Sequence, residues 1–200
     1  MMKKKELEIF LEQIPDFSDP KPGFEQYKTP ATIASDILFQ AYASEDISDK
    51  QILDLGCGTG IFSFGAKTLN ANHVTGIDID QECIDLAVSF AKKNQFNIDF
   101  ICTDVSDVSE KVDTVLMNPP FGAQKQNIHA DRVFIEKATS VASVVYSLHL
   151  EQTLDFINKL LKSLKKEGDV LQIYDFPIKA QFSFHNKLKD TVPVALLQIK

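Results

Sequence analysis

The chain has 200 residues, a mass of 22.4 kDa and a formal net charge of −7, and 44% of its residues are hydrophobic against 24% charged. These values are typical of an ordinary globular protein, and the length suits one domain over residues 1–200 rather than two. The cysteines lack metal-binding spacing, no apolar run approaches the roughly 18 residues of a membrane span, and the first residues lack the apolar core of a signal peptide. We therefore expect a cytoplasmic protein without a disulfide framework, a metal site or a membrane partner.

Hydrophobic periodicity predicts two helices before the first strand, at Lys4–Gln13 and at about Pro30–Ala43. From there strands alternate with helices, or with a helical or loop turn after the third strand, as far as the sixth strand. The expected strands are QILDLG (51–56), HVTGIDID (73–80), IDFICT (98–103), VDTVLMN (112–118), VASVVYSL (141–148), DVLQIYDF (169–176) and VPVALLQIK (192–200). The expected helices between them cover residues 60–69, 81–93, 131–138 and 151–165.

This alternation predicts an α/β fold, with a parallel sheet that helices cover on both faces. Only a loop at 181–190 separates the last two strands, so we expect these two to pair antiparallel. The result is a seven-stranded, mostly parallel sheet whose last strand runs backwards. Ligands of such sheets bind at the carboxyl ends of the strands, and the residues that follow each strand are the candidates for a site.

The first three strand ends predict a nucleoside site. The first strand ends in DLGCGTG, with Gly56, Gly58 and Gly60 at alternate positions and a helix directly after them. Glycines let the backbone approach a ligand closely, and the amino terminus of the helix favours a carboxylate. Asp78 closes the second strand, where it can accept hydrogen bonds from two ribose hydroxyls. Asp104 follows the third strand and can accept one from an adenine amino group.

A dinucleotide-binding fold would show the same strand, glycine turn and acid. The fingerprint of that fold needs a glycine where this chain has Ile61. Asp54 precedes the turn, and an acid there suits a ligand with an ammonium group better than a pyrophosphate. S-adenosylmethionine carries an ammonium beside its carboxylate and sulfonium. The motifs therefore favour this methyl donor over a nicotinamide dinucleotide, and glycines that serve only a turn are the plainest alternative.

The fourth strand ends in MNPPFG, which predicts a stiff loop that receives a planar amine. Pro119 and Pro120 end the strand and restrict the loop. The nitrogen of an aromatic amine attacks a methyl group poorly while its lone pair is delocalised into the ring. The Asn118 side chain and the Pro119 carbonyl can each accept one N–H of such an amine, and Phe121 can stack on its ring. The alternative is an Asn-Pro turn that only ends the strand.

Together these motifs resemble a known family. DLGCGTG, GIDID and MNPPFG look like a Rossmann-like class I methyltransferase that modifies exocyclic amino groups. FEQYKTP, ADR at 130–132, VVYSLHL and FSFH narrow the resemblance to the archaeal and eukaryotic N6-adenine ribosomal RNA methyltransferases, over about Phe24–Lys200. The resemblance implies S-adenosylmethionine as cofactor and the N6 amino group of an adenosine in structured, ribosomal RNA as substrate.

The resemblance also implies a donor site to which an N-terminal extension, residues 1–28, contributes. Its implied members are Gln26, Thr29, Gly56, Thr59, Ile61, Asp78, Asp104 and Val105. The motifs themselves add Asp54, Gly58, Gly60 and Asn118. The expected catalytic motif is Asn118, Pro119, Pro120 and Phe121, and the expected RNA contacts are Lys125, His129, Phe184, Lys187 and Lys189.

The acidic balance, with Arg132 as the only arginine, argues against a strong nonspecific grip on nucleic acid. RNA must then be held locally or with help. Members of the resembled family pair with a small zinc-binding methyltransferase activator through the third strand. This implies such a partner on Ile98–Thr103, an expected edge strand with Ile98, Phe100 and Ile101 as its apolar residues. An edge that the protein's own loops cover is the alternative.

Two further functions stay open on sequence alone. The same chemistry serves other planar amines, such as N2 of guanine, N4 of cytosine or a glutamine amide in a protein. A donor-binding module that stabilises a partner without catalysis is the alternative outside enzymes, and the intact NPPF sequence disfavours it.

Overall fold

The computed structural model describes residues 2–17, 20–21, 25–121, 130–178 and 190–200. Its strands are β1 (Gln51–Leu55), β2 (His73–Asp78), β3 (Asp99–Cys102), β4 (Val112–Met117), β5 (Ala142–Leu150), β6 (Gly168–Ile178) and β7 (Asp190–Ile199). Its helices are α1 (Lys4–Leu11), α2 (Ala31–Ala43), α3 (Ile61–Thr68), α4 (Gln81–Lys93), α5 (Ala130–Val141) and α6 (Leu154–Ser163), with short 3-10 turns η2 (Val105–Asp107) and η4 (Glu151–Thr153).

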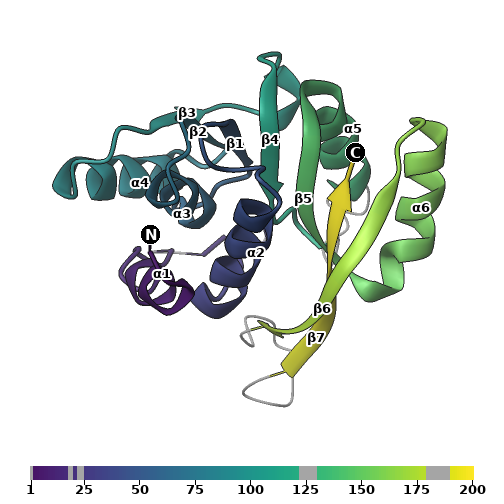
Figure 1. Ribbon diagram of the computed structural model, residues 1–200, viewed down its shortest axis with the longest axis horizontal. Coiled ribbons are helices and arrows are strands. Elements are labelled where there is room, and N and C mark those ends of the chain that lie inside the picture. Colours follow the sequence, from purple (N-terminus) through teal and green to yellow (C-terminus); the bar gives the residue numbers. More distant parts are fainter. Residues whose placement is uncertain (1, 18–19, 22–24, 122–129, 179–189) are drawn as a thin grey trace.

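The strands form one seven-stranded sheet in the order β3-β2-β1-β4-β5-β7-β6 (Figure 1). The strands from β3 to β5 pair in parallel, and β7 pairs antiparallel with both β5 and β6. The predicted α/β fold is therefore confirmed, including the last strand that runs backwards. The stretch predicted as a helix at 151–165 begins as the 3-10 turn η4 before α6.

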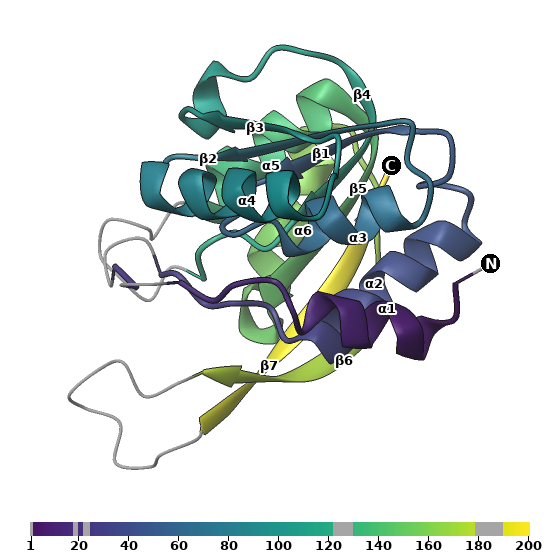
Figure 2. The same cartoon turned by 90° about the vertical axis from the view of Figure 1, so that its left-hand side faces the viewer.

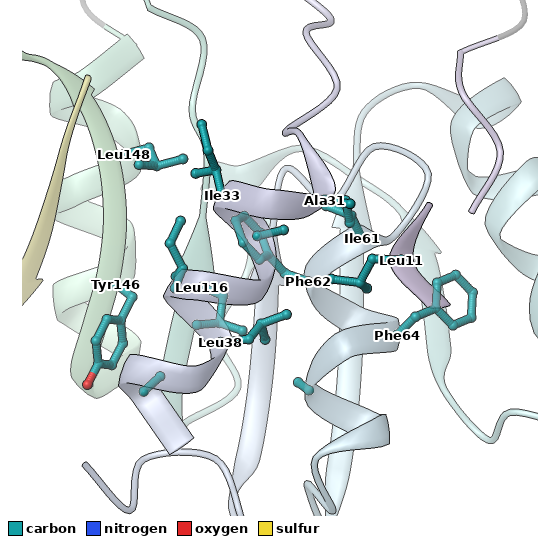
Figure 3. Close-up of a cluster of buried hydrophobic side chains, with 14 of the residues drawn as sticks. Leu11, Ala31, Ile33, Leu38, Ile61, Phe62, Phe64, Leu116, Tyr146 and Leu148 are labelled. Atoms are coloured by element: carbon teal, nitrogen blue, oxygen red, sulfur yellow. The ribbon is translucent and has the colours of Figure 1, made fainter. Parts of the chain in front are cut away.

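Helices cover both faces of the sheet, and the pleat of β4 decides which residues face which layer. Leu116 packs in the hydrophobic cluster that α1, α2 and α3 bury, which Figure 3 shows around Leu38 and Phe62. Met117 packs in the second cluster, under α5 and α6. Because side chains alternate along a strand, Asn118 continues the face of Leu116, toward α2.

The β6–β7 hairpin extends past the carboxyl end of β5 (Figure 2). The last β5–β7 pair joins Leu150 to Val194, whereas the β6–β7 ladder continues through Phe176 and Val192 to the pair of Ile178 with Asp190. This extension lies beyond the carboxyl ends of the parallel strands, where the site is predicted. It brings the buried ring of Phe176 close to that site.

Within the described ranges, no helix is long and apolar enough to cross a membrane. Across the same ranges, His, Cys, Asp and Glu side chains form no group that could hold a metal ion.

Candidate active site

The glycine turn between β1 and α3 is tied to the end of β2 by backbone hydrogen bonds. The amides of Gly56 and Cys57 both donate to the carbonyl of Ile77, each at 2.8 Å. Gly58 has a φ of +53°, and a Cβ atom there would lie 3.1 Å from the ring of Phe17. Both the left-handed backbone and the close ring therefore favour glycine at position 58.

Asp54 is a buried acid with an unsatisfied oxygen. Only 1% of the residue is exposed, and its Oδ2 accepts from the amide of Ser63 at 2.8 Å and from the hydroxyl of Ser63 at 2.7 Å. Its Oδ1 has no hydrogen-bond partner among the described residues. Burial raises the pKa of Asp54 to about 7, although the Ser63 bonds act to lower it. A buried acceptor of this kind fits a cationic hydrogen-bond donor from a ligand.

Asp78 lies beside the turn with its carboxylate held in one orientation. Its Oδ2 accepts from the amide of Gly58 at 2.7 Å, and its Oδ1 accepts from the amide of Asp80 at 2.9 Å. Burial raises its pKa, and the backbone hydrogen bonds act against that rise. Because a carboxylate oxygen can accept more than one hydrogen bond, both oxygens keep capacity for hydroxyl groups.

Asp104 follows β3 as predicted, but it is exposed and caps the turn η2. Its Oδ1 accepts from the amide of Ser106 at 2.8 Å and from the hydroxyl of Ser106 at 2.6 Å. These bonds hold the pKa of Asp104 below its usual value. Val105 is partly buried and packs against the hydrophobic cluster between the sheet and α5. The cap leaves the second carboxylate oxygen of Asp104 for a ligand.

A pocket opens between the glycine turn and the segment that precedes α2. Its lining residues are Phe17, Tyr27, Lys28, Thr29, Gly56, Cys57, Gly58, Thr59, Ile61, Phe62 and Asn118. The Thr59 hydroxyl donates to the carbonyl of Pro15 at 2.8 Å, and Lys28 Nζ donates to the carbonyl of Ile14 at 2.5 Å. The N-terminal segment therefore packs against the glycine turn.

Gln26 lies near this pocket but outside its lining. Its Nε2 donates to Asp80 Oδ2 at 2.7 Å, and its Oε1 accepts from the amide of Lys21 at 2.7 Å. Lys21 Nζ forms an ion pair with the other oxygen of Asp80, also at 2.7 Å. In this structure Gln26 anchors the N-terminal segment to the start of α4, two residues after Asp78.

Asn118 carries the second buried acceptor of the site. Its Nδ2 donates to the hydroxyl oxygen of Thr29 at 3.0 Å, and its Oδ1 is buried without a hydrogen-bond partner among the described residues. Thr29 is itself only 4% exposed. Sequence reasoning assigned Thr29 to the donor and missed its contact with Asn118. That contact joins positions 89 residues apart, and no local signal reports it.

Phe121 stands within an aromatic group that the sequence only partly revealed. It is 6% exposed, and the ring of Tyr27 lies nearly parallel to it, with centroids 6.2 Å apart. Phe176 meets it edge-on at 5.5 Å. Pro119 is buried and Pro120 is half-buried. The NPPF loop, Asn118–Phe121, is thus enclosed by the N-terminal segment on one side and the β6–β7 hairpin on another.

The structure does not describe the residues that the sequence predicts to contact RNA. Lys125, His129, Phe184, Lys187 and Lys189 all lie outside the described residues. Their roles stay predictions.

β3 is an edge strand, as predicted, but its apolar residues are not equally available. Ile101 is 46% exposed. Phe100 instead packs inward, 5.5 Å from the ring of Phe64, and a Cβ atom at Gly76 would lie 2.7 Å from it. Ile98 also packs partly buried against the α1–α3 cluster. Because Gly76 has no side chain, the ring of Phe100 can fill the core there. Of the three apolar residues expected along an open edge, only Ile101 is exposed.

The sequence matches the family model described as the methyltransferase small domain over residues 29–144. An rRNA N6-adenosine methyltransferase of Danio rerio is 38% identical to this chain, over 98% of this chain and 98% of that protein. The chain belongs to the rRNA N6-adenosine methyltransferase family. This methyltransferase is also 39% identical to an uncharacterized protein of Methanocaldococcus jannaschii, over 100% of this chain and 95% of the relative.

A solved structure agrees with the fold of this methyltransferase. The crystal structure of a candidate RNA methyltransferase from Pyrococcus horikoshii superposes with a TM-score of 0.91 at 37% identity, covering 100% of this chain and 98% of that one. The range that the family model matches, residues 29–144, includes the glycine turn, Asp78, Asp104 and the NPPF loop of this chain. The full-length similarities add the N-terminal segment and the β6–β7 hairpin, which enclose that loop.

Proposed function

We propose that this methyltransferase transfers a methyl group from S-adenosylmethionine to the N6 amino group of an adenosine in structured RNA, ribosomal RNA above all. The observation that carries the proposal is Asn118, whose amide nitrogen is held by Thr29 while its buried Oδ1 has no partner among the described residues. An unsatisfied buried acceptor costs about 1–3 kcal/mol. A substrate N–H would satisfy it.

Asn118 and Pro119 act on the amine. The Asn118 Oδ1 and the Pro119 carbonyl each accept one N–H, which turns the nitrogen lone pair out of the plane of the ring. Proline has no N–H of its own, and its ring keeps the loop rigid, so the acceptors stay in place without substrate. A methylated amine loses its extra proton readily, and no strong base is needed. Phe121, with Tyr27 and Phe176 against it, offers an apolar boundary for the base.

The residues present fit S-adenosylmethionine. Its ammonium would satisfy Asp54 Oδ1, and its ribose hydroxyls would donate to Asp78. Asp104 would accept from the adenine amino group, and the glycine turn and the amino terminus of α3 favour the carboxylate. When bound, this cofactor supplies an activated methyl group on a sulfonium.

The choice of adenosine in RNA is supported by similarity over nearly the whole chain to the Danio rerio enzyme. The test is incubation with methyl-labelled donor and either total RNA or total protein, followed by digestion to nucleosides or amino acids. We expect the label in N6-methyladenosine. Label in N2-methylguanosine, N4-methylcytidine or methylglutamine would assign another amine, and no label in any of them would favour a donor-binding module.

We also propose that a small zinc-binding activator binds the edge of β3. The net charge of −7 leaves the chain poorly suited to hold a polyanion alone. Among the described strands β3 lies at the edge of the sheet, so one side of it offers backbone groups for pairing, beside the exposed Ile101. The activator would add a strand there and extend the RNA-binding surface.

Ile101→Asp tests this proposal better than a change at Phe100, because Phe100 belongs to the core. The matched control is Ile173→Asp, since Ile173 is 48% exposed on β6 at the opposite edge. Coexpressed with the activator, the Ile101 variant should lose the complex and keep its donor affinity, while the control keeps both. An intact complex with Ile101→Asp, or a lone chain that gains nothing from the activator, would refute it.

A further inference from the structure

Three polar side chains on β5 and α5 form a chain of hydrogen bonds, and the chemistry proposed above does not use them. His149 Nε2 lies 2.6 Å from the hydroxyl oxygen of Ser147, and His149 Nδ1 lies 2.6 Å from Asp131 Oδ1. Ser147 and His149 are fully buried, and the Asp131 side chain is 13% exposed. A carboxylate only accepts, so the ring N–H at Nδ1 donates to Asp131, and in a neutral ring Nε2 accepts from Ser147.

The order serine, histidine and aspartate is that of a hydrolase triad, but the burial excludes that function. A nucleophilic hydroxyl must reach a substrate carbonyl, with donors nearby for the developing oxyanion. Ser147 has no exposed surface, and both it and His149 lie on the same strand, β5. The hydrogen bonds therefore act within the protein.

The network joins the two ends of the chain segment that carries the catalytic motif. That segment leaves the sheet at Met117, the last residue of β4, and returns at the start of α5. Met117 pairs with Ser147 in the parallel β4–β5 ladder. Asp131, at the start of α5, bonds to His149, two residues further along β5. The bond from Ser147 to His149 closes the connection between these two anchors.

The network lies on the face of the sheet that α5 and α6 cover, and we assign Pro119 to the same face. Val145, two residues before Ser147 on β5, packs in the same cluster under α5 and α6 as Met117. Ser147 and His149 continue that face because side chains alternate along a strand. We extend the same alternation two residues past the end of β4, which assigns Pro119 to the face of Met117, and Pro119 is buried. Its carbonyl is one of the two acceptors assigned to the target amine.

We propose that Asp131, His149 and Ser147 form a clamp that fixes the position of the NPPF loop and thereby the orientation of the acceptor amine. The three are positioning residues, since none is placed against substrate or cofactor. This inference rests on the proposed function for its effect on rate. An error of about 1 Å in the placement of reacting groups costs roughly 100-fold in rate, so a clamp at this site acts on turnover rather than on donor affinity.

Asp131→Ala and Asp131→Asn form the matched pair that tests the clamp. Both remove the negative charge from the first turn of α5, so both lose the same helix-dipole interaction. Only the asparagine keeps an oxygen that accepts from His149. In the whole 200-residue chain, assayed with the proposed activator, we expect Asp131→Ala to lower kcat on RNA about tenfold or more, with donor Kd unchanged. Asp131→Asn should recover most of that loss.

Hydrogen exchange provides a readout that needs no RNA. Pro119 and Pro120 have no amide hydrogen, so the exchange of Asn118 and Phe121 reports the NPPF loop. We expect faster exchange at these two amides in Asp131→Ala and near wild-type exchange in Asp131→Asn. If the wild type transferred no methyl group to RNA, the proposed function would fail. The amide exchange rates of Asn118 and Phe121 would still show whether the clamp fixes the NPPF loop.

Two results would overturn the clamp. One is wild-type exchange at Asn118 and Phe121 in Asp131→Ala, with or without a lower melting temperature, because a purely structural cap would change stability alone. The other is an equal effect of the alanine and asparagine variants on kcat and exchange, which would assign the effect to the lost charge.

Discussion

The residues proposed to bind the donor and those proposed to bind the acceptor amine form two halves of the site, and these halves are built in different ways. On the donor side, Asp54, Asp78 and the glycine turn come from neighbouring strand ends, and their hydrogen bonds join residues close in sequence or in the sheet. On the acceptor side, Asn118 depends on Thr29, and Phe121 on Tyr27 and Phe176, across long stretches of chain. The difference suggests that donor binding survives changes that abolish methyl transfer.

Asn118→Ala is the substitution expected to separate methyl transfer from donor binding most strongly. In the proposed reaction the Asn118 side chain accepts from the target amine in the transition state, so kcat should fall by roughly 100-fold or more while donor Kd changes little. Single-turnover kinetics and calorimetry on the same preparation measure both quantities. Near-normal turnover would mean that another group orients the amine.

The converse change is Asp78→Ala on the donor side. Loss of the charged carboxylate proposed to accept from the ribose should weaken donor binding by about 1.5–3 kcal/mol. At saturating donor the rate of methyl transfer should stay close to that of the wild type. Calorimetry that shows unchanged donor affinity, or new affinity for a nicotinamide dinucleotide, would remove the cofactor assignment.

A smaller effect is expected at Thr29. The family resemblance assigns this residue to the donor site, but in the structure it accepts a hydrogen bond from Asn118. Thr29→Val removes the oxygen that accepts from Asn118 and keeps the side-chain shape, while Thr29→Ser keeps the oxygen. The loss of one hydrogen bond, about 0.5–1.5 kcal/mol, should lower kcat up to roughly tenfold in the valine variant only. If donor Kd rises instead and kcat stays constant, Thr29 belongs to the donor half.

The smallest effect is a pH dependence from Asp54, whose pKa burial raises from 3.8 to about 7. Between these two values the folded protein holds a proton that the unfolded chain has released, so this group's contribution to stability falls as pH rises through that window. Donor affinity should change in the opposite direction. An ammonium prefers the ionised carboxylate, and donor Kd should decrease as pH rises toward 7.

Calorimetry of donor binding between pH 5.5 and 8 is the measurement. Asp54→Asn is the control, because in this variant donor Kd should no longer decrease as pH rises toward 7. Above about pH 8 the donor's own amino group loses its proton, and affinity should fall again. A wild-type donor Kd that is flat from pH 5.5 to 7 would contradict the pairing of the ammonium with Asp54.

The placement of Asp54, Asp78 and the glycine turn could be predicted from the sequence because their geometry is local, while their role toward the donor stays a proposal. A strand, a glycine turn and a helix place Asp54 and Gly58 through spacing alone, and the parallel sheet brings Asp78 alongside. The contacts of Thr29 with Asn118 and of Asp131 with His149 could not be predicted, since they depend on how distant segments pack. Phe100 shows the same limit, because an edge strand suggests exposure and only the space above Gly76 makes its ring part of the core.

The most direct test of this division is a crystal structure of the protein with S-adenosylhomocysteine and adenosine monophosphate. We predict that the amino nitrogen N6 of the nucleotide lies about 2.7–3.2 Å from both Asn118 Oδ1 and the Pro119 carbonyl oxygen. The same structure should show Asp54 and Asp78 in contact with the donor product alone. An N6 atom held by other groups, or Asn118 Oδ1 bound to the donor product, would contradict the account.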